Sequence, residues 1–181
     1  MNLTKVSRYI SYLLRHNPES AGLKLDNHGW CNSKDLIKVL KEKYPGFKSE
    51  MLDEIVNTDE KKRYSFDKYK MRIRANQGHS INVDADLKEA IPPDILYHGT
   101  SIKYVYSIYK EGIKHMSRLY VHLSKDIDTA VKVGKRHGGP VVLEIDCRSM
   151  ISDGYKFYLS ENSVWLTKIV PSKYIKIVNE V

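Results

Sequence analysis

The spacing of the hydrophobic residues changes part-way along this chain, and the change limits the folds it can adopt. In the first 60 or so residues the apolar positions recur every three or four places, the period of a helix. Tyr64, Phe66, Met71, Ile73 and Ala75 instead alternate with polar residues, the period of a strand. The sequence therefore predicts three helices followed by a two-stranded hairpin, an order that is typical of a winged-helix-like module.

Each of these helices is expected to begin at a hydroxyl side chain that can cap it. Thr4, Ser33 and Ser49 precede apolar residues at helical spacing. The first helix is expected over residues 5–16, because Pro18 disfavours helical geometry in the residue before it. The buried faces are predicted to consist of Val6, Ile10, Leu13, Leu14, Leu36, Ile37, Leu40, Met51, Leu52, Ile55 and Val56.

Two adjacent prolines, Pro92 and Pro93, follow a polar stretch and mark a break in the chain. We place a domain boundary there, with domains over residues 1–90 and 91–181. The second domain is predicted to be rich in strands. One helix is expected to begin at Ser101 and end at Gly112, and another to begin at Ser124. Its strands are expected at residues 95–97, 120–123, 141–145, 157–159, 164–167 and 174–178. The predicted fold class is therefore α+β.

Composition narrows the partners of the chain. It has 30 Lys and Arg against 22 Asp and Glu, a formal net charge of +8 that favours a polyanion such as RNA, DNA or an anionic membrane. The two cysteines, Cys31 and Cys147, have no zinc-ligand spacing and the histidines form no ligand pairs, so no metal is expected. Without a signal peptide or an apolar run of about 20 residues, a cytoplasmic protein with no membrane segment is expected.

Polar residues whose side chains could take part in catalysis or ligand binding lie where predicted strands or helices end. Taken singly, such residues are usually surface charges, solvated histidines or turn glycines. Period two puts Arg72 and Arg74 on the same face of a strand, so spacing alone does not choose between them. The segments are residues 15–16, 74–80, 98–100, 118–124 and 136–139.

The order of these segments resembles one known family, the RNA 2′-phosphotransferases (KptA in prokaryotes). The similarity runs from Val6 to Val178, and its most specific strings are LLRHNP at residues 13–18, IRANQGHS at 73–80, LYHGT at 96–100 and YVHLS at 120–124. The resemblance implies an N-terminal lobe that binds an RNA 2′-phosphate. It also implies a C-terminal lobe like an ADP-ribosyltransferase, built from two small antiparallel sheets that hold NAD⁺.

The activity implied by the resemblance is NAD-dependent removal of an internal RNA 2′-phosphate of the tRNA splice-junction type. The phosphate first attacks the ribose of NAD⁺ and displaces nicotinamide, and the 2″-hydroxyl then attacks the phosphorus. The products are RNA with a 2′-hydroxyl and ADP-ribose 1″,2″-cyclic phosphate. A monomer is the expected state.

The resemblance assigns the catalytic roles to Arg15, His16, Arg74 and Arg118, and so chooses Arg74 over Arg72. Arginine forks match phosphate oxygens, and a histidine titrates near neutrality, which suits His16 as the acid for the departing 2′-oxygen. The residues assigned to cofactor contacts are His98, Gly99, Thr100, His122, Ser124, Asn76, His79 and Ser80.

Two of these contacts have a physical reason. Gly99 lets backbone approach a ligand closely, and the helix that begins at Ser124 offers free amide groups to a pyrophosphate. Arg136, His137, Lys114 and His115 lie near the set in the chain, without an assigned role.

One position departs from the wider ADP-ribosyltransferase pattern. Val164 stands where many of those enzymes carry a glutamate. A 2′-phosphate already carries close to two negative charges, so it needs no base and a carboxylate would repel it. Two alternatives remain open: an ADP-ribosyltransferase that stops after the first step, and a winged-helix nucleic-acid-binding protein whose second domain senses a nucleotide.

Overall fold

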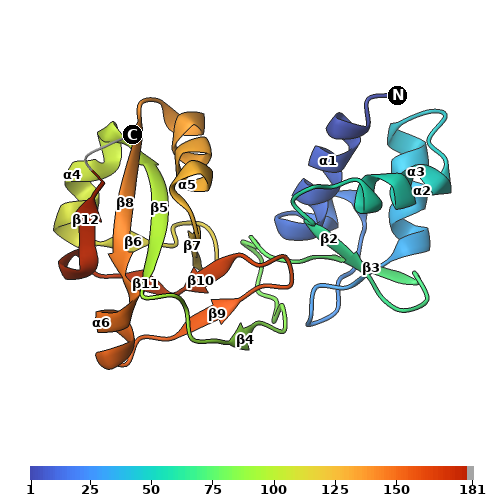
Figure 1. The fold of residues 1–181 in the computed structure, drawn as a ribbon. Coiled ribbons are helices and arrows are strands. Elements are labelled where there is room, and N and C mark those ends of the chain that lie inside the picture. The colour runs from blue at the N-terminus through green and yellow to red at the C-terminus, as the bar shows by residue number, and fades with distance from the viewer. Residues whose placement is uncertain (179–181) are drawn as a thin grey trace. The chain divides into compact units, whose positions relative to one another are not determined.

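The computed structural model describes residues 1–178, except for the side chain of His137. The chain divides into two compact units, Met1–Asp86 and Leu87–Val181 (Figure 1). The division falls a few residues ahead of the two prolines at which the sequence places a boundary. Helices and antiparallel strands occur in both units, which confirms the α+β class.

Three α-helices and a small sheet make up the first unit. Its elements are α1 (Leu3–Arg15), the 3₁₀ helix η1 (Pro18–Ala21), β1 (Cys31–Asn32), α2 (Ser33–Lys43), α3 (Ser49–Asn57), β2 (Tyr64–Phe66) and β3 (Arg72–Ala75). The sheet has the strand order β1-β3-β2, and both strand pairs are antiparallel. β2 and β3 form the predicted hairpin, with Tyr64 opposite Ala75 and Phe66 opposite Ile73.

Helix α1 begins earlier than the sequence predicts. The side chain of Asn2 accepts a hydrogen bond from the Lys5 amide at 3.0 Å, so Asn2 caps the helix and Thr4 lies inside it. Asparagine caps a helix as well as a hydroxyl residue does, and the chain offers both within three positions. The helix ends at Arg15, and Pro18 starts the short η1, as its fixed backbone geometry favours.

The starts of α2 and α3 also lie one residue from the predicted positions. Asn32 caps α2 by accepting from the Lys34 amide at 2.9 Å, which leaves Ser33 buried in the first turn. Ser49 is the first residue of α3, and the residue before it, Lys48, makes no side-chain capping hydrogen bond.

The predicted apolar faces of the three helices meet in one core. Ile37, Met51 and Val56 lie at its edge, partly buried. The hairpin adds Tyr64, Ile73 and Ala75 to the core from its inner side. The buried helical residues are Val6, Ile10, Leu13, Leu14, Leu36, Leu40, Leu52 and Ile55.

The second unit is built from short strands and helices. Its elements are β4 (Lys88–Glu89), β5 (Ile95–Ser101), α4 (Ile102–Glu111), β6 (Ile113–Lys114), β7 (Val121–Leu123), α5 (Ile127–Gly134), η2 (Lys135–His137), β8 (Pro140–Asp146), α6 (Cys147–Ser152), β9 (Phe157–Leu159), β10 (Trp165–Thr167), β11 (Ile169–Val170), η3 (Ser172–Tyr174) and β12 (Ile175–Ile177). Every strand pair among them is antiparallel.

These strands form three sheets, whereas the sequence predicts two. One sheet has the order β12-β8-β5 and places His98 opposite Leu143. Another has the order β4-β9-β10-β7 and places Leu166 between His122 and Tyr158. The third is the two-stranded pair β11-β6, which the sequence analysis did not foresee.

Strand β5 is longer than predicted. It includes His98, Gly99 and Thr100, which the sequence places beyond its end. Helix α5 packs directly against it, because a Cβ atom on Gly99 would lie 1.7 Å from the Ala130 carbonyl oxygen. A Cβ on Gly134 would lie 2.6 Å from the Thr100 carbonyl oxygen. The two glycines thus allow the helix and the strand to touch backbone to backbone.

Asp126, not Ser124, caps α5. Its carboxylate accepts from the Thr129 amide at 2.7 Å, so the helix begins two residues later than predicted. Helix α4 ends as predicted at Gly112, whose φ of +77° suits a residue without a side chain. Among residues 1–178, no helix is long and apolar enough to cross a membrane.

Candidate functional site

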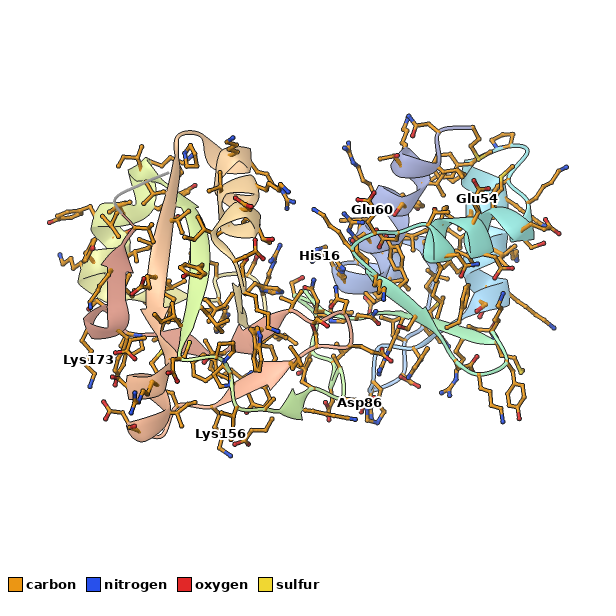
Figure 2. All side chains as sticks on the ribbon, in the orientation of Figure 1. His16, Glu54, Glu60, Asp86, Lys156 and Lys173 are labelled. Atoms are coloured by element: carbon orange, nitrogen blue, oxygen red, sulfur yellow. The ribbon has the colours of Figure 1, made fainter. Side chains whose placement is uncertain are left out.

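In the first unit, the segment after β3 folds back onto the end of α1. The Ser80 amide donates to the Arg15 carbonyl at 3.0 Å, and the Ser80 hydroxyl lies 2.9 Å from Nδ1 of His16. Gly78, with a φ of +88°, brings this segment alongside Arg15, whose guanidinium carbon would lie 3.7 Å from a Cβ at that glycine. Two strings that are about 60 residues apart in sequence are thereby joined. His16 is exposed at the end of α1 (Figure 2).

The side chain of Arg74 is held between an aromatic ring and a carboxylate. Its guanidinium lies over the ring of Trp30, 4.5 Å from the centroid, and Nη1 donates to Oδ2 of Asp86 at 2.6 Å. The other carboxylate oxygen of Asp86 lies 2.8 Å from Nδ1 of His28. The hydrogen bond from Arg74 holds the pKa of the Asp86 carboxyl below its usual range. Stacking and the ion pair together fix the plane and the direction of the Arg74 fork.

The structure separates Arg72 from Arg74, which the period-two spacing alone leaves equivalent and between which the family resemblance chooses Arg74. The Arg74 side chain is 10% exposed, whereas the Arg72 side chain is 51% exposed and forms ion pairs with Asp26 and Asp67. Both lie over Trp30, but the Arg72 guanidinium is farther from the ring centroid, at 5.3 Å. Arg74 is therefore the inner of the two arginines.

His79 lies beside the same cations. Its ring is 3% exposed, and burial, followed by the charges of Arg15, His16 and Arg74, lowers its pKa to about 4. The ring is therefore neutral at pH 7. Its buried Nε2 has no hydrogen-bond partner among residues 1–178. The first unit thus brings three of the four predicted catalytic residues around one uncharged ring.

Asn76 has a bracing role that the sequence did not foresee. Its side-chain amide donates to the Lys62 carbonyl, and its backbone amide donates to the Arg63 carbonyl, both at 2.8 Å. The residue is 4% exposed. These bonds tie the end of β3 to the chain that precedes β2. A contact between Asn76 and a cofactor stays a prediction.

In the second unit, His98 and His122 are linked through the main chain. Nδ1 of His98 lies 3.1 Å from the His122 carbonyl oxygen, and a carbonyl only accepts, so this nitrogen carries the proton. Burial lowers the pKa of His98, and the nearby charge of Arg118 adds to the effect, while the bond to His122 opposes it. His98 is therefore a neutral ring of fixed tautomer. Nδ1 of His122 in turn lies 3.1 Å from the Tyr120 carbonyl oxygen.

The structure does not bear out the physical reasons given for ligand contacts at Gly99 and Ser124, and the contacts themselves stay predictions. The space beside Gly99 is filled by Ala130 of α5, so the missing side chain allows packing within the unit. Ser124 exchanges two backbone hydrogen bonds with Tyr97, at 2.7 and 2.8 Å, and does not open a helix. The N-terminus of α5 carries the Asp126 carboxylate, which would repel a pyrophosphate.

Alternation along β5 separates the predicted ligand-binding residues, His98 and Thr100, from Gly99, which packs against α5. Gly99 faces α5, so His98 and Thr100 lie on the opposite face of the strand. Thr100 is nevertheless buried, with 6% of its surface exposed. His98 and Thr100 therefore keep the shared face that a ligand site on this strand requires.

Arg118 belongs to the neighbourhood of His98. Arg118 is exposed, but partial desolvation by neighbouring groups lowers the pKa of its guanidinium, and the charge of Arg136 lowers it further. Two like charges held near each other favour an anion between or beside them. The fourth predicted catalytic residue thus lies in the second unit, and Arg136, which had no assigned role, accompanies it.

One group of metal-ligand side chains occurs among the described residues, consisting of His28, Asp84 and Asp86, all exposed. Asp86 already has a cationic partner in Arg74. We therefore assign no metal to this group, and the expectation of a metal-free site stays a prediction.

The chain is similar to known proteins along nearly its whole length. Residues 1–169 match the model of a family described as RNA 2'-phosphotransferase, Tpt1 / KptA family. The chain is 56% identical over 176 residues to a probable RNA 2'-phosphotransferase of Fusobacterium nucleatum, a match that spans 97% of this chain and 98% of that protein. Proteins with the same description match from Flavobacterium johnsoniae (51% over 176 residues, 97% of each chain) and Acaryochloris marina (45% over 172 residues, 95% of each).

The chain belongs to the RNA 2′-phosphotransferase family. The resemblance read from the four strings is thereby confirmed. The matches to these RNA 2′-phosphotransferases extend across both units.

Two residues of this RNA 2′-phosphotransferase escaped the sequence analysis. Trp30 lies in a turn that the Asp26 side chain closes by accepting from the amides of His28 and Trp30, at 2.9 and 3.0 Å. Because the chain has only two tryptophans, Trp30 could have been singled out from the sequence as a candidate site residue. Asp86 offered no such signal, because its neighbours in the chain do not resemble a strand end or a cap.

Three further positions bear on the chemistry of the chain. Cys31 and Cys147 are buried, and burial raises the pKa of both thiols to about 12, so neither is a ready nucleophile. Val164 lies in the turn between β9 and β10, where its amide donates to the Ser160 hydroxyl at 3.0 Å. This turn presents no carboxylate at the Val164 position.

Proposed function

We propose that this chain removes an internal 2′-phosphate from RNA and uses NAD⁺ as its second substrate. One observation carries the proposal: each unit holds arginine side chains near a histidine that is neutral at pH 7. Arg15 and Arg74 lie near His79 in the first unit, and Arg118, which has Arg136 near it, lies near His98 in the second. A phosphate monoester and a dinucleotide both offer negative charge that offsets the charge of these arginines. Family membership supports the same activity.

Removal of the phosphate takes two steps. First, an oxygen of the RNA 2′-phosphate bonds to the anomeric carbon of the nicotinamide ribose, and nicotinamide leaves as a neutral base. Second, the 2″-hydroxyl of that ribose bonds to phosphorus and loses its proton, while the bond from phosphorus to the RNA 2′-oxygen breaks and that oxygen gains a proton. The products are RNA with a 2′-hydroxyl and ADP-ribose 1″,2″-cyclic phosphate.

The first unit holds and activates the phosphate. Arg15 and Arg74 bind its oxygens through their planar forks and stabilise the charge of the five-coordinate phosphorus. The fixed orientation of Arg74 over Trp30 means that little reorganisation is needed when the charge develops. His16, exposed and oriented by the Ser80 hydroxyl, donates the proton to the departing 2′-oxygen.

The second unit binds the dinucleotide. His98 meets the nicotinamide ribose as a neutral ring whose tautomer the His122 carbonyl fixes. Thr100 lies on the same strand face and His122 on the neighbouring strand β7. Arg118 stabilises the negative charge on the phosphoryl oxygens in the second step, because its guanidinium carries a permanent positive charge. A monomer that acts on RNA of the tRNA splice-junction type completes the proposal.

Incubation with NAD⁺ and a short RNA that bears one internal 2′-phosphate tests the function directly. Mass spectrometry should find RNA lacking the phosphate, free nicotinamide and ADP-ribose 1″,2″-cyclic phosphate. RNA that gains the mass of ADP-ribose and stops there would identify a transferase that lacks the second step. Unchanged RNA, still bound by the protein, would identify a binding module and overturn the proposal.

Replacing Arg15 or His16 separates the two steps. Arg15→Ala and His16→Ala should accumulate the ADP-ribosylated RNA, with the second step slower by about 100-fold because a phosphate ligand or the proton donor is lost. Arg8→Ala is the matched control, since Arg8 is an exposed arginine on the same helix. Quench-flow time courses with labelled RNA measure both steps. Equal slowing of both steps in the two variants would contradict the assigned roles.

A further inference from the structure

We infer that the turn joining β2 to β3 is a second contact for RNA, which holds nucleotides beside the phosphate that Arg74 binds. The hairpin tip consists of Lys68, Tyr69, Lys70 and Met71. Tyr69 is 72% exposed and Met71 63% exposed, although both are large apolar side chains. The inference rests on the proposed function, because it takes RNA to be the substrate.

The hairpin tip is a turn that several hydrogen bonds hold in one conformation. The Lys70 amide donates to the Asp67 carbonyl at 3.0 Å, and Oδ1 of Asp67 accepts from the Met71 amide at 2.8 Å. Oδ2 of Asp67 also pairs with Nε of Arg72 at 3.2 Å. These bonds hold Lys70 at a φ of +55°, which a residue with a side chain rarely adopts. An ordered turn presents its side chains at little entropic cost on binding.

The chemistry of the hairpin tip suits single-stranded RNA. The ammonium group of Lys68 lies 5.5 Å from the centre of the Tyr69 ring, and both side chains are exposed. An aromatic face stacks on a base of any sequence, and an adjacent lysine pairs with the backbone phosphate. Lys70 is held by Asp53 at 2.7 Å, which braces the turn against α3. The excess positive charge of the chain favours this polyanion over a neutral partner.

The hairpin tip also lies within reach of the proposed phosphate site. Met71 and Arg74 are three positions apart along the β3 side of the hairpin, or about 10 Å of extended chain. RNA whose 2′-phosphate binds Arg74 therefore needs only a few more nucleotides to meet Tyr69. This arrangement predicts that the contribution of Tyr69 depends on the length of the RNA.

The test compares a 2′-phosphorylated dinucleotide with a 2′-phosphorylated RNA of about ten nucleotides, a length within the range that such single-strand sites cover. Tyr69→Ala should raise KM for the longer RNA about tenfold, as the loss of one stacked base predicts, and leave KM for the dinucleotide and kcat for both unchanged. Tyr106→Ala is the control, because Tyr106 is 80% exposed on α4 of the second unit. Melting temperatures verify that both variants fold.

Equal KM values for the longer RNA in the wild type and in Tyr69→Ala would overturn the inference and leave the proposed function intact. An equal rise in KM for Tyr106→Ala would also overturn it. The same holds if Tyr69→Ala changes only the binding of the protein to anionic vesicles, or only its self-association, and leaves RNA binding unchanged. Affinity for the same RNA without its 2′-phosphate supplies a readout that needs no turnover. A wild type that binds this RNA but converts nothing would contradict the proposed function alone, and the roughly tenfold loss in Tyr69→Ala would still decide the inference.

Discussion

At the scale of single residues, the two neutral histidines have one cause in common. His79 is buried and His98 is partly buried, and each has an arginine nearby, so desolvation and like charge act on both rings in the same direction. His16, at the end of α1, is by contrast an exposed histidine. A buried neutral ring orients its neighbours, whereas an exposed ring can exchange a proton.

The low pKa of His79 predicts a pH-dependent stability. The unfolded ring takes up a proton below about pH 6.5, and the folded ring only near pH 4, so the stabilisation is complete above pH 6.5 and disappears as the pH falls toward 4. Between pH 7 and pH 4 this residue alone should remove about 3 kcal/mol from the free energy of unfolding. His79→Gln, which keeps a polar group near Nε2, should lose less over that range. Urea titrations at several pH values measure the difference, and parallel curves for the two proteins would contradict the assignment.

At the scale of elements, the caps show where local sequence is ambiguous. Asn2 lies near Thr4, and Asn32 lies beside Ser33, so two good caps compete for each helix. In both helices the asparagine caps the helix, because its backbone is extended and its side chain reaches the first free amides. Helix existence and the buried face are correctly predicted in all three cases, because they depend on the spacing of many residues and not on one.

The contact between α5 and β5 yields a sharp prediction. Gly99→Ala puts a Cβ atom into the Ala130 carbonyl, and backbone on both sides must move. The free energy of unfolding should fall by about 3 kcal/mol or more, at the upper end of the cost of overpacking. Thermal and chemical unfolding measure the change.

Gly139→Ala is the matched control for that substitution. A Cβ on Gly139 would meet only the Ile102 side chain, at an ordinary 3.8 Å, so stability should change by less than about 1 kcal/mol. If Gly99→Ala folds with the stability of the wild type and loses only NAD⁺ binding, the ligand role predicted from sequence would replace the packing role.

At the scale of the whole molecule, the chain has two separate cores. Leu13 belongs to the core of the first unit and Leu143 to that of the second, and both are fully buried. Each core gathers side chains from one side of the division between Asp86 and Leu87. The division of the predicted catalytic residues follows the same line, with Arg118 alone in the second unit.

Cavities made in each core should report on their own unit. Leu13→Ala should cost about 2–5 kcal/mol and speed amide hydrogen exchange chiefly within residues 1–86. Leu143→Ala, the reciprocal variant, should do so chiefly within residues 87–178. Hydrogen-exchange mass spectrometry resolves the two segments. Equal acceleration in both segments by either variant would show that the two cores unfold as one.

The sequence by itself determined the α+β class, the three helical faces, the hairpin and the family. Those features follow from the spacing of neighbouring residues and from short strings, which the chain carries without folding. Only the tertiary structure decided that Arg74 is more buried than Arg72 and that Gly99 packs against α5. It alone also showed that Trp30 and Asp86 orient the side chain of Arg74, which we propose to bind the phosphate. Burial and charge at these positions come from residues distant in the chain, and no local pattern of side chains encodes them.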